Sequence, residues 1–92
     1  MKRNLSRHAA TRSQQRGISA SAIDYLLEFG SEHYDHHGAI VVLLDHAAAR
    51  RIARVRDLRR SELDALRGIY AVVASDGRVR TVGHRTRRLQ RH

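Results

Sequence analysis

The sequence contains no cysteine and no proline, and its six glycines are the main breakers of regular structure. Without cysteine the chain can form neither a disulfide framework nor a thiolate metal site, and a reducing compartment is compatible with that composition. Without proline, repeats or low-complexity linkers, the organisation must be inferred from the glycines and from apolar periodicity. Stability must therefore come from packing or from a partner.

Long hydrophobic runs are also missing. The longest, residues 39–44, is far too short to span a bilayer, and no apolar run follows the basic first residues as a secretory signal would require. We therefore expect a cytoplasmic protein that has no membrane partner. The 92 residues support a single domain, residues 1–92, with enough aliphatic side chains to fold around one core.

Positive charge is what the chain has in excess. The formal net charge is +9, and 17 of the 18 basic residues are arginine. The part of the chain after His46 holds 13 of the basic residues but only four of the nine acidic ones. Guanidinium groups match phosphate geometry and stack on bases, so this one-sided distribution favours RNA or DNA as a partner. A solvated, solubility-promoting surface and an anionic membrane surface are the alternatives.

Two helices are predicted near the N-terminus. Residues 6–16 contain no breaker and end at Gly17, which suits a helix closed by a glycine in the left-handed conformation. Ser19 is a good N-cap for a second helix, which Gly30 is placed to terminate. The link between the helices is so short that they must form a tight corner.

The middle of the chain predicts a hairpin and then helical structure. A polar segment, residues 31–37, is separated by Gly38 from the apolar run 39–44, which indicates a hairpin with a buried second strand. Residues 47–66 are rich in arginine and carry apolar residues at helical spacing. We expect one or two short helices there.

An Asp-Gly pair separates two β-rich runs, residues 69–74 and 78–84, and is a strong hairpin signal. Strict alternation along the second run would make one face largely cationic, with these side chains on it: Arg78, Arg80, Val82 and His84. The whole pattern predicts an α+β fold in which two N-terminal helices pack on a small antiparallel sheet. Residues 85–92 predict a basic tail that orders on binding.

Two groups of residues are candidates for chemistry. In the first helix His8, Arg12 and Arg16 share one stripe that is able to hold phosphates, although a solvated face with Arg16 paired to an acid such as Glu28 is the better explanation of the spacing alone. The closing strand supplies the second group, in which histidine can transfer a proton and arginine can stabilise a phosphorane. The alternative for that group is a basic edge strand kept soluble by its charge.

The predicted roles are as follows. The catalytic candidates are His8, Arg16, Arg80, Thr81 and His84. The predicted nucleic-acid-binding residues are Arg12, Arg78, Arg85, Arg87, Arg88 and Arg91. RNA cleavage by the 2′-hydroxyl needs only such groups, so no cofactor or metal is expected. The polar segment 33–37 with His46 offers metal-ligand side chains, but a polar hairpin is the plainer interpretation.

Two parts of the chain carry a recognisable pattern: the opening segment 8–19 with Ile23, Leu27 and Gly30, and the closing segments 72–77 and 79–82 with Arg85. Together they resemble a bacterial family known as domain-of-unknown-function family 4258. The resemblance implies a RelE/ParE-like α+β fold, within a superfamily of metal-independent ribonucleases and toxins that cut RNA or inhibit gyrase and pair with an antitoxin. The positions it matches are His8, Arg16, Thr81 and Arg85.

Three hypotheses about function follow. The first is a metal-independent endoribonuclease of the toxin type, with His8 or His84 as the general acid or base. The second is a basic module that binds RNA or DNA without catalysis. The third is a toxin-like domain whose basic surface docks an acidic, antitoxin-like protein.

Overall fold

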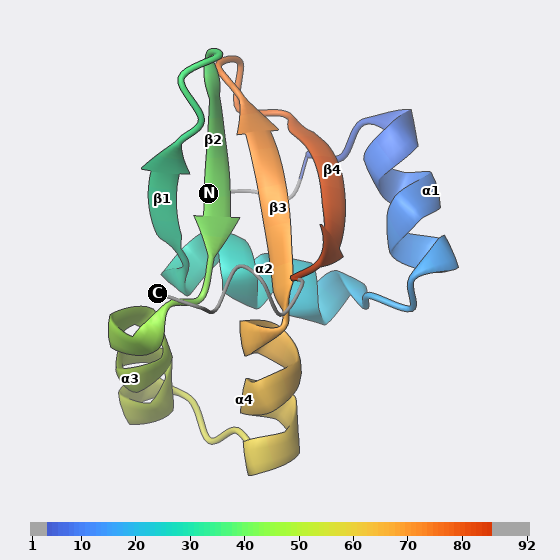
Figure 1. The fold of residues 1–92 in the computed structure, drawn as a ribbon. Coiled ribbons are helices and arrows are strands. Elements are labelled where there is room, and N and C mark those ends of the chain that lie inside the picture. Colours follow the sequence, from blue (N-terminus) through green and yellow to red (C-terminus); the bar gives the residue numbers. More distant parts are fainter. Residues whose placement is uncertain (1–3, 86–92) are drawn as a thin grey trace.

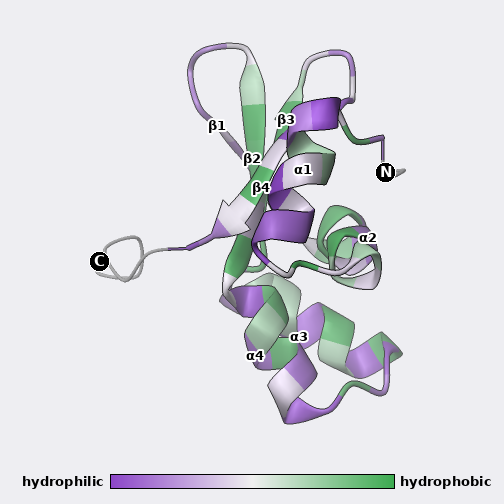
Figure 2. Cartoon of the chain, turned by 90° about the vertical axis from the view of Figure 1, so that its right-hand side faces the viewer, coloured by the Kyte–Doolittle hydropathy of each residue, from purple (hydrophilic) through white to green (hydrophobic). Residues whose placement is uncertain are grey.

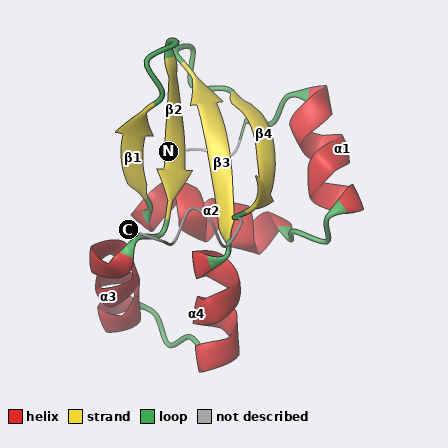
Figure 3. Cartoon of the chain, in the orientation of Figure 1, coloured by secondary structure: helices red, strands yellow, loops and turns green. Residues whose placement is uncertain are grey.

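The computed structural model describes residues 4–85, which form four helices and one four-stranded antiparallel sheet (Figures 1 and 3). The fold is therefore α+β, as the sequence predicts. Along the chain the elements are α1 (Arg7–Gln15), α2 (Ala20–Phe29), β1 (Ser31–Tyr34), β2 (Ala39–Leu43), α3 (His46–Val55), α4 (Arg60–Arg67), β3 (Ile69–Ala74) and β4 (Val79–His84). Among these described residues, no helix has the length and apolar character needed to cross a membrane.

The strands lie in the order β1-β2-β3-β4, and α3 and α4 are inserted between β2 and β3. Helix α2 crosses one face of the sheet, and the main core lies between them (Figure 1). Ile23 and Leu26 of α2 pack there against Val42 and Val73, and all four are almost fully buried. Burial of this apolar surface is the main force that holds α2 on the sheet.

The opposite face of the sheet carries no helix of the described chain, and Figure 2 shows the sheet from its β4 side with α2 on one side only. Val41 and Leu43 of β2 lie on this open face. In β3, Val72 is directly opposite Val41 and Tyr70 is directly opposite Leu43. These four side chains are half-buried, whereas their β3 neighbour Ala71 is fully buried. The molecule therefore presents a partly apolar sheet surface.

Helix α1 lies beside β4, the edge strand (Figure 1). The backbone before α1 extends the sheet, because Ser6 N donates to the Val79 carbonyl at 2.9 Å and Val79 N donates to the Asn4 carbonyl at 2.7 Å. Gly17 closes the helix with a φ of 65°, the left-handed conformation predicted for it. Only two α1 residues, Ala9 and Ser13, are buried, so most of this helix faces solvent.

Ser6 is expected to contribute more to stability than an ordinary helix cap. Its hydroxyl accepts from Ala9 N at 3.0 Å and donates to the Arg80 carbonyl at 3.1 Å. Ser19 caps α2 through Ala22 N at 3.1 Å, and no second bond of its hydroxyl is found in residues 4–85. We predict that Ser6→Ala lowers the free energy of unfolding by about 2 kcal/mol and Ser19→Ala by about 1 kcal/mol. Urea denaturation of both variants checks this; equal losses would contradict it.

One expectation about β4 is wrong. Thr81 lies opposite Val72 and Val79 lies opposite Val73, so Arg80 is an extra residue in β4, a β-bulge. The bulge breaks the alternation of side chains, and Val79 and Val82 both enter the core. Val82 therefore does not share an exposed cationic face with Arg78, Arg80 and His84. The Ser6 hydroxyl donates to the carbonyl of this bulged residue, Arg80.

Candidate nucleic-acid interface

An open hollow lies where the N-terminus of α1 meets the β3-β4 hairpin. It is lined by Ser6, His8, Val72, Asp76, Arg78, Arg80 and Thr81. Three predicted catalytic residues and one predicted binding residue therefore lie around one concave surface. They come from chain segments about 70 positions apart, which the pairing of Ser6 with Val79 brings together.

The local structure explains how the hollow is built. The Ser6 hydroxyl joins the start of α1 to the Arg80 carbonyl, which places the first helical turn, with His8, next to the bulge. Asp76 accepts a hydrogen bond from Arg78 N at 2.9 Å in the hairpin turn. The hollow thus has two guanidinium groups and one carboxylate, and the positive end of the α1 dipole adds to the potential there. This arrangement attracts an anion.

The other two predicted catalytic residues lie at the far end of α1. His84 Nε2 is 3.0 Å from the Arg16 carbonyl oxygen, so this nitrogen donates its hydrogen to the end of the helix. Arg16, the C-cap of α1, is eight positions after His8, which corresponds to about 12 Å along the axis. The predicted set is therefore divided, with His8, Arg80 and Thr81 in one group and Arg16 and His84 in another.

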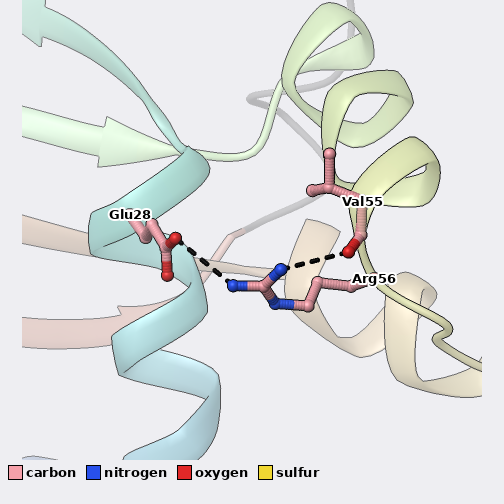
Figure 4. Close-up of polar contacts among 3 residues, drawn as sticks. All are labelled: Glu28, Val55 and Arg56. Carbon is pink, nitrogen blue, oxygen red and sulfur yellow. Dashed lines mark hydrogen bonds and ion pairs between the residues drawn. The ribbon is translucent and has the colours of Figure 1, made fainter.

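The suggested pairing of Arg16 with Glu28 does not occur, because Glu28 pairs with Arg56 instead. Arg56 Nη2 lies 3.5 Å from Glu28 Oε2, and Nη1 donates to the Val55 carbonyl at 3.0 Å (Figure 4). The same guanidinium stands over the Phe29 ring, 5.5 Å from its centroid. Both charged side chains are about half exposed, so the pair contributes little to stability but does orient the loop after α3.

Several other arginines of the second half also serve the fold. Arg51 Nη2 donates to the Phe29 carbonyl at 3.0 Å, at the end of α2, and Arg85 Nη1 donates to the Arg67 carbonyl at 3.1 Å, at the end of α4. Such contacts satisfy carbonyls that a helix end leaves free. Arg85, predicted to bind nucleic acid, therefore has a structural contact in this fold. Arg12 is half-buried on α1, and Arg87, Arg88 and Arg91 lie outside the described residues.

The polar hairpin between β1 and β2 has an internal explanation. Asp35 accepts from His37 N at 2.7 Å and from Ala39 N at 3.1 Å, and these hydrogen bonds lower the pKa of its carboxyl. Asp45 caps α3 by accepting from Ala48 N at 2.9 Å, which likewise lowers its pKa. Within residues 4–85 no three histidine or acidic side chains are grouped as a metal site would require.

Comparisons with protein-family models, curated proteins and solved structures found no significant match. The resemblance to family 4258 stays a prediction, and the candidate site rests on its own geometry.

Sequence reasoning missed two residues that shape this surface, Ser6 and Tyr70. Ser6 was recognisable as the start of a helix, but its bond to Arg80 joins residues 74 positions apart and has no local signal. Tyr70 was assigned to a strand without a role. Its position on the open face beside β4 follows only from the register of the sheet.

Proposed function

We propose that this chain binds single-stranded RNA in the cytoplasm and cleaves it without a metal ion, with the scissile phosphate in the hollow. The observation that carries the proposal is the convergence of His8, Arg78, Arg80 and Thr81 on one open surface at the positive end of α1. A single open site of this kind admits an extended strand, and arginine binds phosphate bidentately.

The chemistry would use the RNA's own 2′-hydroxyl as the nucleophile. The exposed imidazole of His8 takes the proton of the 2′-hydroxyl, whose oxygen attacks the phosphorus, and the bond from phosphorus to the 5′ oxygen breaks. The 5′ oxygen leaves with a proton from water, and a 2′,3′-cyclic phosphate remains. Arg78 and Arg80 stabilise the negative charge that develops on the phosphoryl oxygens, and the Thr81 hydroxyl donates to one of them.

His8 suits the proton transfer better than His84. The ring of His8 is exposed in the hollow, beside the arginines that would hold the phosphate. The Nε2 atom of His84 is occupied by the Arg16 carbonyl, which leaves one ring nitrogen for chemistry and places it away from Arg80. For the same reason Arg16 is assigned no part in the proton transfer.

The proposal is tested by incubating the purified protein with an end-labelled single-stranded oligoribonucleotide in excess chelator. Fragments that end in a cyclic phosphate are expected, and a DNA strand of the same sequence should stay intact because it lacks the 2′-hydroxyl. Binding without cleavage would overturn the nuclease assignment and favour a non-catalytic binding module. Failure to bind RNA would overturn the proposal entirely.

Binding should also depend on salt through the arginines of the hollow. Each phosphate contact that is lost removes about 0.7 from the slope of log affinity against log salt for a single strand. We therefore predict that Arg78→Ala and Arg80→Ala each reduce the slope by about that amount. Arg50→Ala is the matched control, because Arg50 is an exposed arginine of α3 that does not line the hollow. Fluorescence anisotropy across a salt series measures this, and an equal loss in the control would contradict the location.

A further inference from the structure

A second feature of the open sheet face lies next to the hollow. Tyr70 of β3 and Gly83 of β4 are directly opposite each other. A Cβ atom built on Gly83 would lie 2.6 Å from Arg16 Nη1, 2.9 Å from the Tyr70 hydroxyl oxygen and 3.0 Å from Tyr70 Cε1. The ends of the arginine and tyrosine side chains therefore both lie over the backbone of Gly83, and any other residue at position 83 would occupy that space.

This group is close to the hollow along the strand. Val72 and Thr81, which line the hollow, are the neighbouring cross-strand pair on the same face of the sheet. Two residues along a strand correspond to about 7 Å. A ligand with its phosphate in the hollow would thus reach Tyr70 with the adjacent nucleotide.

Packing alone explains only part of this arrangement. An aromatic ring commonly covers a glycine on a neighbouring strand, and Tyr70 does so here. That explanation does not account for Arg16, whose Nη1 atom also lies over Gly83, on the same side as the Tyr70 ring. The ion pairs of Glu28 and Glu62 are made with Arg56 and Arg59, not with Arg16. A cation beside a half-buried aromatic ring on an open sheet is suited to a flat, electron-rich ligand group that is attached to an anion.

We propose that Tyr70 and Arg16 form a base-binding site for the nucleotide next to the phosphate in the hollow. The base stacks on the Tyr70 ring, and the Arg16 guanidinium lies at its edge, where it donates hydrogen bonds to base or phosphate oxygens. This inference rests on the proposed function, and it adds a site for the base to one for the phosphate.

The test uses a short single-stranded oligoribonucleotide that carries the fluorescent base 2-aminopurine at successive positions, bound to protein with His8→Ala so that the RNA stays intact. Stacking on Tyr70 is expected to quench the fluorescence at one position. Tyr70→Leu should remove this quenching and weaken binding roughly 5- to 150-fold, whereas Tyr70→Phe, which keeps the ring, should retain both.

Gly83→Ala provides an independent test, because the new methyl group displaces the ends of two flexible side chains and no backbone atom is among its closest contacts. It should reduce the quenching as Tyr70→Leu does, with circular dichroism unchanged. If the RNA binds and neither variant changes quenching or affinity, the base site is wrong while the phosphate site stands. If no RNA binds to any of these proteins, both proposals fail.

Discussion

His8→Ala is expected to lower the rate of RNA cleavage by about 10²- to 10⁴-fold, the usual contribution of a general acid or base. The affinity for RNA should change little, because the arginines that hold the phosphate remain. His8 is exposed in the first turn of α1 and does not belong to the hydrophobic core. Single-turnover cleavage at saturating protein separates the chemical step from binding.

His84→Ala is the matched control for that experiment. It removes an exposed histidine of the same type, whose Nε2 contacts the Arg16 carbonyl about 12 Å along α1 from His8. We expect cleavage in this variant to stay within a few-fold of the native rate. A large loss in His84→Ala with normal cleavage in His8→Ala would reverse the assignment and move the reacting phosphate to the other end of α1.

Gly30→Ala is expected to destabilise the fold by roughly 3 kcal/mol, at the upper end of the range for overpacking. Gly30 has a φ of −68°, which any residue can adopt, so its backbone conformation is not the reason. An added Cβ would lie 2.5 Å from the Leu26 carbonyl oxygen and 2.6 Å from Val42 Cγ1. Relieving both contacts requires the end of α2 to move away from β2, which opens the core.

Gly68→Ala serves as the control, because it adds the same methyl group at the end of α4. Its Cβ would come no closer than 3.5 Å to the surrounding atoms, an ordinary van der Waals contact with the Ala65 carbonyl oxygen. Urea unfolding should show a change of less than about 0.5 kcal/mol for this variant, as is usual for a surface substitution. If both variants lost the same free energy of unfolding, the close approach of Leu26 and Val42 would not be the reason that position 30 requires glycine.

The secondary structure was largely predictable because its signals are local. Ser19 caps α2, as its position before an apolar segment indicates. Gly17 closes α1 in the left-handed conformation, as its position after a breaker-free segment indicates. The Asp76-Gly77 turn joins β3 to β4, where an Asp-Gly pair between two β-rich runs predicts a hairpin. Each of these signals acts within about five residues along the chain, so tertiary contacts did not change the type of these elements.

The candidate site was predictable only in part. The sequence suggested His8, Arg80 and Thr81 separately, but spacing could not show that they share one hollow while Arg16 and His84 lie elsewhere. The alternation assumed for β4 failed at Arg80, because the bulge depends on a partner strand. The charge count likewise could not distinguish Arg56, which pairs with Glu28, from the arginines of the hollow.

The sequence by itself determined the type and order of the elements, the strong positive charge and the lack of disulfide or thiolate chemistry, because these depend on composition and on neighbours along the chain. Only the tertiary structure decided which arginines face a common surface and which satisfy helix ends. It also brought Tyr70, Gly83 and Arg16 together on the open face. The physical reason is that contacts between distant segments set both the strand register and the pairing of residues 4–6 with β4. The free energy of those contacts is gained only when the whole core forms.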